Sequence, residues 1–181
     1  MKQVTICISG SIAAHKVPLI VDKLSRHDLD LFIAMTKSSQ AFVSPLTLEV
    51  LSKRSIIKDV IESQLIAPVD HIFLAQKSDL VVIVPATANT IGKIANGLAD
   101  DIVSSICMVI PKKIPKLIVP AMNQEMYVQD ILQENLSKLK SRNYIEIPPQ
   151  VDLLASGDIG IGALADSDII VSEILKILEL A

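Results

Sequence analysis

The chain has 181 residues, of which 50% are apolar and only 3% aromatic, and its formal net charge is −3. This length predicts one domain with an aliphatic core, and the low charge without a basic run argues against a nucleic-acid partner. The mean hydropathy of +0.49 is high, yet no apolar run approaches the roughly 18 residues of a membrane-spanning helix. No signal peptide is apparent either, so we expect a cytoplasmic protein with no membrane partner, whose surplus apolar surface is buried between subunits.

Strands and helices alternate along the chain. Residues 3–9 predict a first strand that ends at Gly10, and residues 12–25 predict a helix. Further strands are expected where apolar residues run almost without interruption, over 29–36, 79–86, 115–121 and 144–148. Other helices are expected over 45–52, 71–78, 88–96, 101–110, 129–142 and 168–180, and residues 53–68 are expected to form a surface excursion.

Such alternation predicts an α/β fold, a single Rossmann-like domain over residues 1–181 with a doubly wound parallel sheet. In sheets of this kind, ligands bind beyond the carboxyl ends of the strands. Small or polar residues, which let a ligand approach the backbone, stand at four of the predicted strand ends: 10–11, 36, 87–90 and 121–123. The segments "VIVPATAN" and "LIVPAMN" repeat one pattern, because each ends a strand with Pro-Ala and places an asparagine soon after.

Taken singly, most of these features have an ordinary structural explanation. Gly10 and Ser11 fit a helix N-cap better than a phosphate site, and no GxGxxG fingerprint is present. From spacing alone, His71 is better explained as a surface or capping residue than as a general base, and His15 has no comparable context. Asp100 and Asp101 fit helix capping and stabilisation of the helix dipole better than paired acid/base catalysis, and no spacing of Cys, His and carboxylate residues predicts a metal site.

Four segments together are more specific than any one of them: "GSIAAHK", "PATANTIGKIANGLADD", "PAMNQEMY" and "SGDIGIGALA". They resemble the homo-oligomeric flavin-containing cysteine decarboxylases, and among these the phosphopantothenoylcysteine decarboxylases of the coenzyme A pathway, from Val4 to about Asp166. The resemblance implies a homotrimer, or a multiple of trimers, with FMN bound between subunits. The substrate that it implies is 4'-phosphopantothenoyl-L-cysteine, which loses CO₂ to give 4'-phosphopantetheine.

The resemblance also implies roles for individual residues. Two sets would hold the flavin, the first around its phosphate and ribityl chain and the second in another loop: Gly10, Ser11, Ile12, Thr36 and Ser38, then Thr87, Ala88, Asn89, Thr90 and Ala121. Asn123 would hold the substrate carboxylate, and His71 would be the catalytic base, which reverses the interpretation favoured by spacing alone. Met126, Ala155 and Gly157 would line the substrate.

Ser156 stands where the family motif "ACGDxGxGxxA" has a cysteine. In the family, flavin oxidises the carbon that bears sulfur, CO₂ leaves, and the cysteine protonates the enethiolate as the hydride returns. A serine hydroxyl is a far weaker acid than a thiol, whose reference pKa is about 8.5. We therefore expect decarboxylation with a poor final reductive step. The neighbouring glycines would make this segment a flexible loop that closes over the substrate.

Several explanations stay open for Ser156. It is an engineered change, or the mark of an enzyme that stops at the enethiol, as the peptidyl-cysteine decarboxylases of lantibiotic synthesis do, or the mark of a non-catalytic regulatory flavoprotein. The presence of His71 and Asn123 argues against the regulatory subunit. The "PAMN" and "GDxGxG" motifs favour a decarboxylase over a flavin prenyltransferase. Tyr127, where the family has tryptophan, is expected to keep an aromatic wall.

Overall fold

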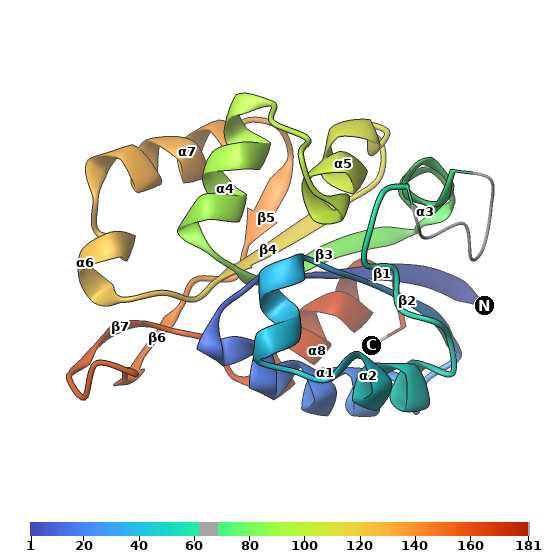
Figure 1. The fold of residues 1–181 in the computed structure, drawn as a ribbon, viewed down its shortest axis with the longest axis horizontal. Helices are drawn as coiled ribbons and strands as arrows, with labels where there is room; N and C mark the ends of the chain where they lie inside the picture. Colours follow the sequence, from blue (N-terminus) through green and yellow to red (C-terminus); the bar gives the residue numbers. More distant parts are fainter. Residues whose placement is uncertain (62–68, 181) are drawn as a thin grey trace.

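In the computed structural model, which describes residues 1–61 and 69–180, a parallel five-stranded sheet lies between two layers of helices (Figure 1). The strands lie in the order β2-β1-β3-β4-β5, with the bounds β1 Lys2–Ile8, β2 Leu29–Met35, β3 Leu80–Ala86, β4 Lys116–Pro120 and β5 Tyr144–Glu146. The predicted doubly wound parallel sheet is confirmed. The order of the strands reverses between β1 and β3, and at such a reversal a crevice opens beyond the strand ends.

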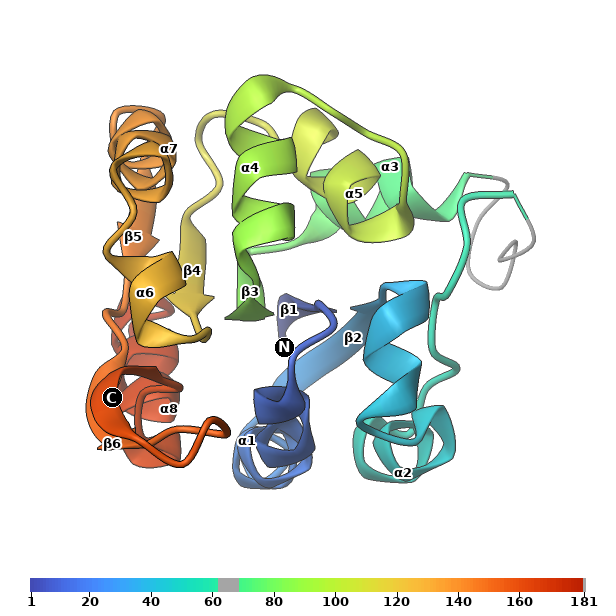
Figure 2. The same cartoon turned by 60° about the vertical axis from the view of Figure 1, so that its left-hand side comes forward.

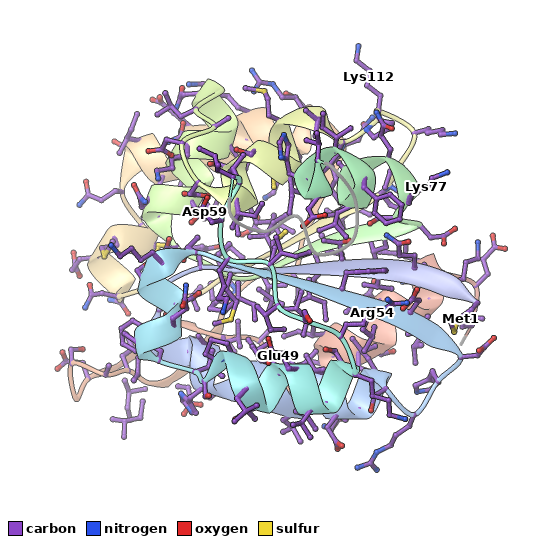
Figure 3. All side chains as sticks on the ribbon, turned by 45° about the vertical axis from the view of Figure 1, so that its right-hand side comes forward. Met1, Glu49, Arg54, Asp59, Lys77 and Lys112 are labelled. Atoms are coloured by element: carbon purple, nitrogen blue, oxygen red, sulfur yellow. The ribbon has the colours of Figure 1, made fainter. Side chains whose placement is uncertain are left out.

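Helices cover both faces of the sheet (Figure 2), and side chains fill the space between the layers (Figure 3). One layer holds α1 (Val17–Leu24), α2 (Pro45–Ser52) and α8 (Ser167–Ile177). The other holds α3 (Asp70–Lys77), α4 (Ala88–Asn96), α5 (Ile102–Val109) and α7 (Asp130–Lys140). Among the described residues, no helix combines the length and the apolar character needed to cross a membrane.

The side chains of each central strand divide between two apolar clusters, one on each face of the sheet. In β1, Val4, Ile6 and Ile8 join the cluster of α1 and α8, whereas Cys7 joins the cluster of α3, α4 and α5. All four side chains are fully buried, and burial of a large aliphatic side chain stabilises a fold by roughly 1.5–3 kcal/mol. This burial on both faces explains why the strands read as continuous apolar runs.

Three short helices begin where strands end, at the carboxyl edge of the sheet: η1 (Ile12–Lys16), η2 (Lys37–Ala41) and α6 (Gln124–Tyr127). The single helix predicted over residues 12–25 is wrong, because the chain forms η1 and then α1. Pro18 lies in the first turn of α1, where its missing N–H costs nothing, so a new helix starts there.

The predicted surface excursion over residues 53–68 is also corrected. Ile57 is fully buried, and Met35 N–H donates to its carbonyl at 2.9 Å, so this residue extends the sheet beside β2. Residues 62–68 of the same prediction lie outside the described residues.

A separate antiparallel hairpin projects from the carboxyl edge of the sheet (Figure 1). It consists of β6 (Gln150–Leu153) and β7 (Ile159–Ala163), with Leu153 paired to Ile159 next to the turn. The loop predicted from the glycine-rich sequence is therefore wrong for residues 159–163, which are a strand. Residues 154–158 form the turn that carries Ser156.

Asp101 caps α5 through a capping box. Its carboxylate accepts the Ser104 N–H at 2.8 Å, and the Ser104 hydroxyl accepts the Asp101 N–H at 3.1 Å. Burial raises the pKa of Asp101, but hydrogen bonds from Ser104 and from Lys93 outweigh it and hold that pKa below its usual value. The capping role expected from the sequence is confirmed for Asp101, whereas Asp100 pairs with Lys93.

Asp101→Ala is expected to lower the free energy of unfolding by about 1 kcal/mol at neutral pH, because α5 loses its cap. Since the pKa of Asp101 is lowered in the folded state, its stabilisation is present above the unfolded pKa of about 3.9 and is lost as pH falls through the folded pKa. Urea denaturation of both proteins should show a difference that shrinks in acid. Asp100→Ala is the control, since Asp100 pairs with Lys93 but caps no helix. Equal losses in the two variants would contradict the prediction.

Candidate functional site

Two adjoining cavities open at the carboxyl edge of the sheet. The first, of about 340 Å³, is called the β1–β3 cavity, and its lining residues are Gly10, Thr36, Lys37, Ser38, Thr87, Asn89, Thr90, Lys93 and Asp101. The second, of about 390 Å³, is called the hairpin cavity, and it is lined by Ser11, Ile12, Ala13, His15, Lys16, Ala121, Met122, Asn123, Leu153, Leu154, Ala155, Ser156, Gly162, Ala163 and Leu164. The cavities adjoin because the neighbours Gly10 and Ser11 line one each.

Short hydroxyl side chains dominate the β1–β3 cavity. The hydroxyls of Thr36 and Ser38 lie 3.2 Å apart, and the Thr87 hydroxyl donates to the Thr90 hydroxyl at 3.1 Å. A Cβ on Gly10 would collide with the Ser38 side chain, so only glycine lets the end of β1 pass this close to η2. Hydroxyls around a close-packed backbone can bind the oxygen atoms of a phosphate or a polyol.

The charges around the β1–β3 cavity are largely paired. The Lys93 ammonium lies 2.7 Å from the Asp100 carboxylate and 2.9 Å from that of Asp101, and these contacts, with Asp100 first, raise the pKa of Lys93. Lys37 forms no ion pair with a described residue and is the cation left for a bound anion. In the described part of the chain, no three His, Cys, Asp or Glu side chains form a group that could hold a metal ion.

Asn123 marks the point where β4 leads into the hairpin cavity. Its Oδ1 accepts the Glu125 N–H at 2.8 Å and so caps α6, which fixes the orientation of the amide. No described residue accepts a hydrogen bond from the Nδ2 group. Asn123 therefore offers a positioned N–H donor to a ligand in the cavity.

The hairpin is fastened to the segment around Asn123. Met122 N–H donates to the Gly162 carbonyl at 2.9 Å, and Ile161 N–H donates to Gln124 Oε1 at 3.1 Å. A Cβ on Gly160 would collide with Gln124, and a Cβ on Gly162 would collide with the Met122 carbonyl. The glycines of β7 are thus required by a close approach of two backbones.

Ser156 lies in the turn of the hairpin and shares the hairpin cavity with Asn123. Two backbone hydrogen bonds hold the turn, from Leu154 N–H to the Asp158 carbonyl at 2.8 Å and from Gly157 N–H to the Leu154 carbonyl at 2.9 Å. The turn is therefore structured around Ser156, whose side chain is exposed.

Twelve of the sixteen predicted site residues line one of the two cavities, and four do not: His71, Ala88, Met126 and Gly157. Ala88 and Gly157 directly follow lining residues, and Met126 lies exposed on α6. His71 is the clear exception. It is the second residue of α3, which packs against α5 across the molecule from the hairpin (Figures 1 and 2). Its Nδ1 is buried and has no hydrogen-bond partner among the described residues.

Tyr127, which is expected to keep an aromatic wall, contacts another part of the fold within this subunit. Its hydroxyl donates to Glu146 Oε1 at 3.0 Å, and burial followed by the Glu146 carboxylate raises the pKa of Tyr127 to about 12. Tyr127 lines neither cavity and instead ties α6 to β5.

Among the lining residues of the hairpin cavity that sequence reasoning missed, two have basic side chains, His15 and Lys16. His15 Nδ1 lies 2.7 Å from the Ile12 carbonyl, which orients the ring, and Lys16 is the only lysine or arginine among the lining residues. Their position could have indicated this role, because they lie about one helical turn after Ser11 on a helix that begins where β1 ends.

The comparisons of this chain with known proteins agree on one family. A family model described as Flavoprotein matches residues 1–179. The chain is 40% identical over 173 residues to a probable phosphopantothenoylcysteine decarboxylase of Streptococcus mutans, covering 96% of this chain and 97% of that protein. It is 38% identical over 165 residues to the coenzyme A biosynthesis bifunctional protein CoaBC of Escherichia coli, covering 91% of this chain but only 40% of that protein.

Solved structures agree with the sequence relatives. A cysteine-to-serine mutant of PPC decarboxylase, complexed with pantothenoylaminoethenethiol, matches with a TM-score of 0.89 and 32% identity, covering 98% of both chains. The FMN binding protein AtHal3 matches with a TM-score of 0.85 and 31% identity, covering 99% of this chain and 98% of that one.

Gly162→Ala is expected to speed hydrogen exchange of the Met122 amide by about tenfold or more, because the new Cβ pushes β7 away from Met122 and breaks their hydrogen bond. Exchange measured by NMR at this single amide tests the contact. The matched control is Gly157→Ala, since both glycines have a positive φ, of 144° and 90°, but the space around Gly157 is open. Equal acceleration in the control would mean that the strain of a side chain at a positive φ, and not the lost contact with Met122, causes the faster exchange.

Proposed function

This chain belongs to the flavoprotein family, and we propose that it is an FMN-dependent decarboxylase of 4'-phosphopantothenoyl-L-cysteine in coenzyme A biosynthesis. The observation that carries the proposal is the meeting of Asn123 and Ser156 in one cavity, next to a second cavity lined by hydroxyls. A relative named as a probable phosphopantothenoylcysteine decarboxylase covers nearly the whole chain and supports it. Residues 1–181 would act as one catalytic domain.

The β1–β3 cavity fits FMN by its chemistry. Its hydroxyls suit the flavin phosphate and ribityl chain, the cavity lies where the strand order reverses, and the relative AtHal3 is an FMN binding protein. The residues that would hold FMN are Gly10, Ser11, Ile12, Thr36 and Ser38, followed by Thr87, Ala88, Asn89, Thr90 and Ala121. These residues would hold a cofactor that supplies a hydride acceptor for the substrate carbon that bears sulfur.

The residues of the hairpin cavity would bind and orient the substrate. Asn123 would donate from Nδ2 to the substrate carboxylate, while its capped Oδ1 keeps the amide from turning. Lys16 would supply the positive charge for the phosphate group at the other end of the substrate. Ala155, Gly157 and Met126 would contact the substrate around these two points, and the hairpin would exclude water from it.

Ser156 decides how far the reaction would go. Return to the saturated thiol needs a proton donor near the enethiolate, and a serine hydroxyl is a poor acid. A relative that carries a cysteine-to-serine substitution is complexed with an ethenethiol, and this supports an enethiol as the product here.

We expect the purified protein to show the visible spectrum of a flavin. In air, where dioxygen takes the two electrons from the reduced flavin, it should convert 4'-phosphopantothenoyl-L-cysteine into CO₂ and the enethiol, identified by mass spectrometry. Ser156→Cys should release saturated 4'-phosphopantetheine instead, because a thiol restores the proton donor. Ser25→Cys, which adds an exposed thiol elsewhere, is the control. A colourless protein would overturn the proposal, and saturated product at equal rates with and without the cysteine would overturn the role of Ser156. A peptide ending in cysteine, assayed in parallel, tests the peptidyl-cysteine alternative.

We infer that the protein is a homotrimer, or a multiple of trimers, in which His71 of one subunit acts at the hairpin cavity of another. Within one subunit, α3 lies across the molecule from the hairpin, and His71 Nδ1 is buried without a described partner. Apolar side chains stand on the hairpin itself, where Leu153 is 66% exposed and Ile159 is 78% exposed. A neighbouring subunit would cover these side chains and bring its His71 to the substrate as the base.

Mixing two inactive variants tests this arrangement. His71→Asn removes the base, and Asn123→Asp keeps the cap of α6 but repels the substrate carboxylate, so each alone should lose at least about 100-fold in rate. Trimers assembled from equal amounts should regain about a quarter of the normal rate, because a quarter of the sites pair an intact His71 with an intact Asn123. The control mixes Asn123→Asp with a variant that carries both substitutions. This mixture should recover no activity, because no subunit has an intact Asn123. If the first mixture stays inactive, both residues act within one subunit.

We also propose the cytoplasm as the compartment. Cys7 and Cys107 are both buried and free, and both contribute to the same apolar cluster. Reduced thiols that pack as small apolar groups are typical of proteins in a reducing compartment.

A further inference from the structure

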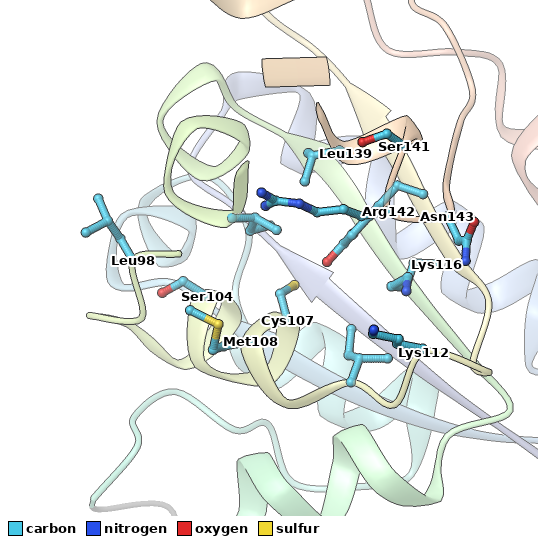
Figure 4. A pocket seen from close by; sticks show the side chains of 13 residues that line it. Leu98, Ser104, Cys107, Met108, Lys112, Lys116, Leu139, Ser141, Arg142 and Asn143 are labelled. Carbon is cyan, nitrogen blue, oxygen red and sulfur yellow. The ribbon is translucent and has the colours of Figure 1, made fainter. Parts of the chain in front are cut away.

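A third cavity, of about 420 Å³, opens at the opposite, amino edge of the sheet (Figure 4). We call it the amino-edge cavity. It lies where β4 and β5 begin and where α4, α5 and α7 end, and it shares no lining residue with the two cavities at the carboxyl edge. Its volume lies within the range of sites that bind small molecules.

The amino-edge cavity is lined by three cations and by no carboxylate. The cations are Lys112, Lys116 and Arg142, and Figure 4 shows them around the same hollow as Cys107 of α5. Figure 3 shows Lys112 at the surface, whereas Lys116 is only 5% exposed. Such a concentration of positive charge is unexpected in a chain whose net charge is −3.

Two acidic side chains, one on β5 and one at the start of α5, pair with lysines that do not line this cavity. Glu146 of β5 pairs with Lys140 at 2.5 Å, and Asp101 at the start of α5 pairs with Lys93 at 2.9 Å. Neither carboxylate is paired with a cation of the cavity, and Lys112, Lys116 and Arg142 form no ion pair with a described residue.

Lys116 is the strongest indication of a ligand. Its ammonium lies 5.1 Å from the centre of the Tyr144 ring, and it forms no ion pair within the described part of the chain. Burial lowers the pKa of Lys116. The side chain is largely enclosed but lines the cavity, and the cavity leaves room beside the ammonium for an anion that would stabilise its charge.

Arg142 provides a second, oriented donor. Its Nη1 donates to the Ala95 carbonyl at 2.9 Å, which holds the guanidinium against the end of α4. The remaining N–H groups can form the paired hydrogen bonds by which arginine recognises a carboxylate or a phosphate.

The rest of the lining is apolar. Met108 and Leu98 are about half exposed, at 52% and 56%, and Leu139 is buried beneath them. A ligand that satisfies both parts of the cavity has a charged head and a short apolar body.

We propose that the amino-edge cavity binds a small organic anion, whose oxyanion group lies between Lys116 and Arg142 and whose apolar part packs against Met108 and Leu139. Carboxylates and phosphate esters share this chemistry. The site lies beyond the first residue of β4, whereas Asn123 lies beyond its last, so the inference does not rest on the proposed decarboxylation.

Calorimetric titration of the purified holoprotein with hexanoate, hexyl phosphate and hexanol tests the proposal. At least one of the two anions should bind about tenfold or more tightly than hexanol, because the alcohol lacks the oxyanion. The tighter of the two anions identifies the head group. The ε-methyl NMR signal of Met108 should shift during the same titration, which locates the ligand.

Two variants provide the decisive comparison. Lys116→Met and Arg142→Gln should each weaken binding of the tighter anion about tenfold or more, and Arg142 lies in an exposed loop where substitution leaves the core intact. Lys113→Met, which removes a neighbouring exposed lysine outside the cavity, should leave the affinity unchanged. The proposal is overturned if neither anion binds, if hexanol binds equally well, if the Met108 signal does not move, or if Arg142→Gln binds as tightly as the unchanged protein.

Discussion

The burial of the parallel sheet on both faces is the constraint on which the rest of the structure depends. Helices pack on each side, and the side chains of the central strands are buried in two apolar clusters. The helices therefore cover both faces of the central strands and leave no room there for a ligand. Only the edges remain. Because all five strands run the same way, their carboxyl ends and the starts of η1, η2, α4 and α6 gather at one edge, where small side chains and free N–H groups meet. The position of the functional site follows from this topology before any catalytic residue is considered.

The sheet and most helices could be predicted from the sequence because their signals are local. Strands buried on both faces are continuous apolar runs, and the caps of α4 and α5 are short polar motifs. The hairpin could not be predicted in the same way. Residues 159–163 alternate isoleucine or alanine with glycine, and glycine weakens every local indication of a strand. What fixes β7 is the approach of Gly160 and Gly162 to the segment 122–124, a contact between parts of the chain that are far apart in sequence.

The residues of the candidate site also differ in whether a local sequence signal or a long-range contact places them. The hydroxyl residues of the β1–β3 cavity follow from strand ends, since each lies directly after a strand, but Asn123 and Ser156 are brought together only by the hairpin. His71 shows the limit most clearly. Its position before β3 can be identified from the motif, and it stands at the end of α3 that is farther from the amino edge, yet the helix lies on the α5 side of the sheet. The sequence identifies the side chain but not the subunit whose substrate it would meet.

The two edges of the sheet are electrostatic opposites, and this bears on the amino-edge cavity. The ends of α4, α5 and α7 direct carbonyl groups toward this edge, and their partial negative charge attracts cations such as Arg142. That attraction contributes about 0.3–1 kcal/mol at an exposed helix end. The helix ends therefore account for the exposed Arg142 and Lys112. Lys116 differs from them, because most of its side chain is enclosed and burial lowers its pKa, so an anion in the adjoining space would stabilise its charge more than it would a fully exposed lysine.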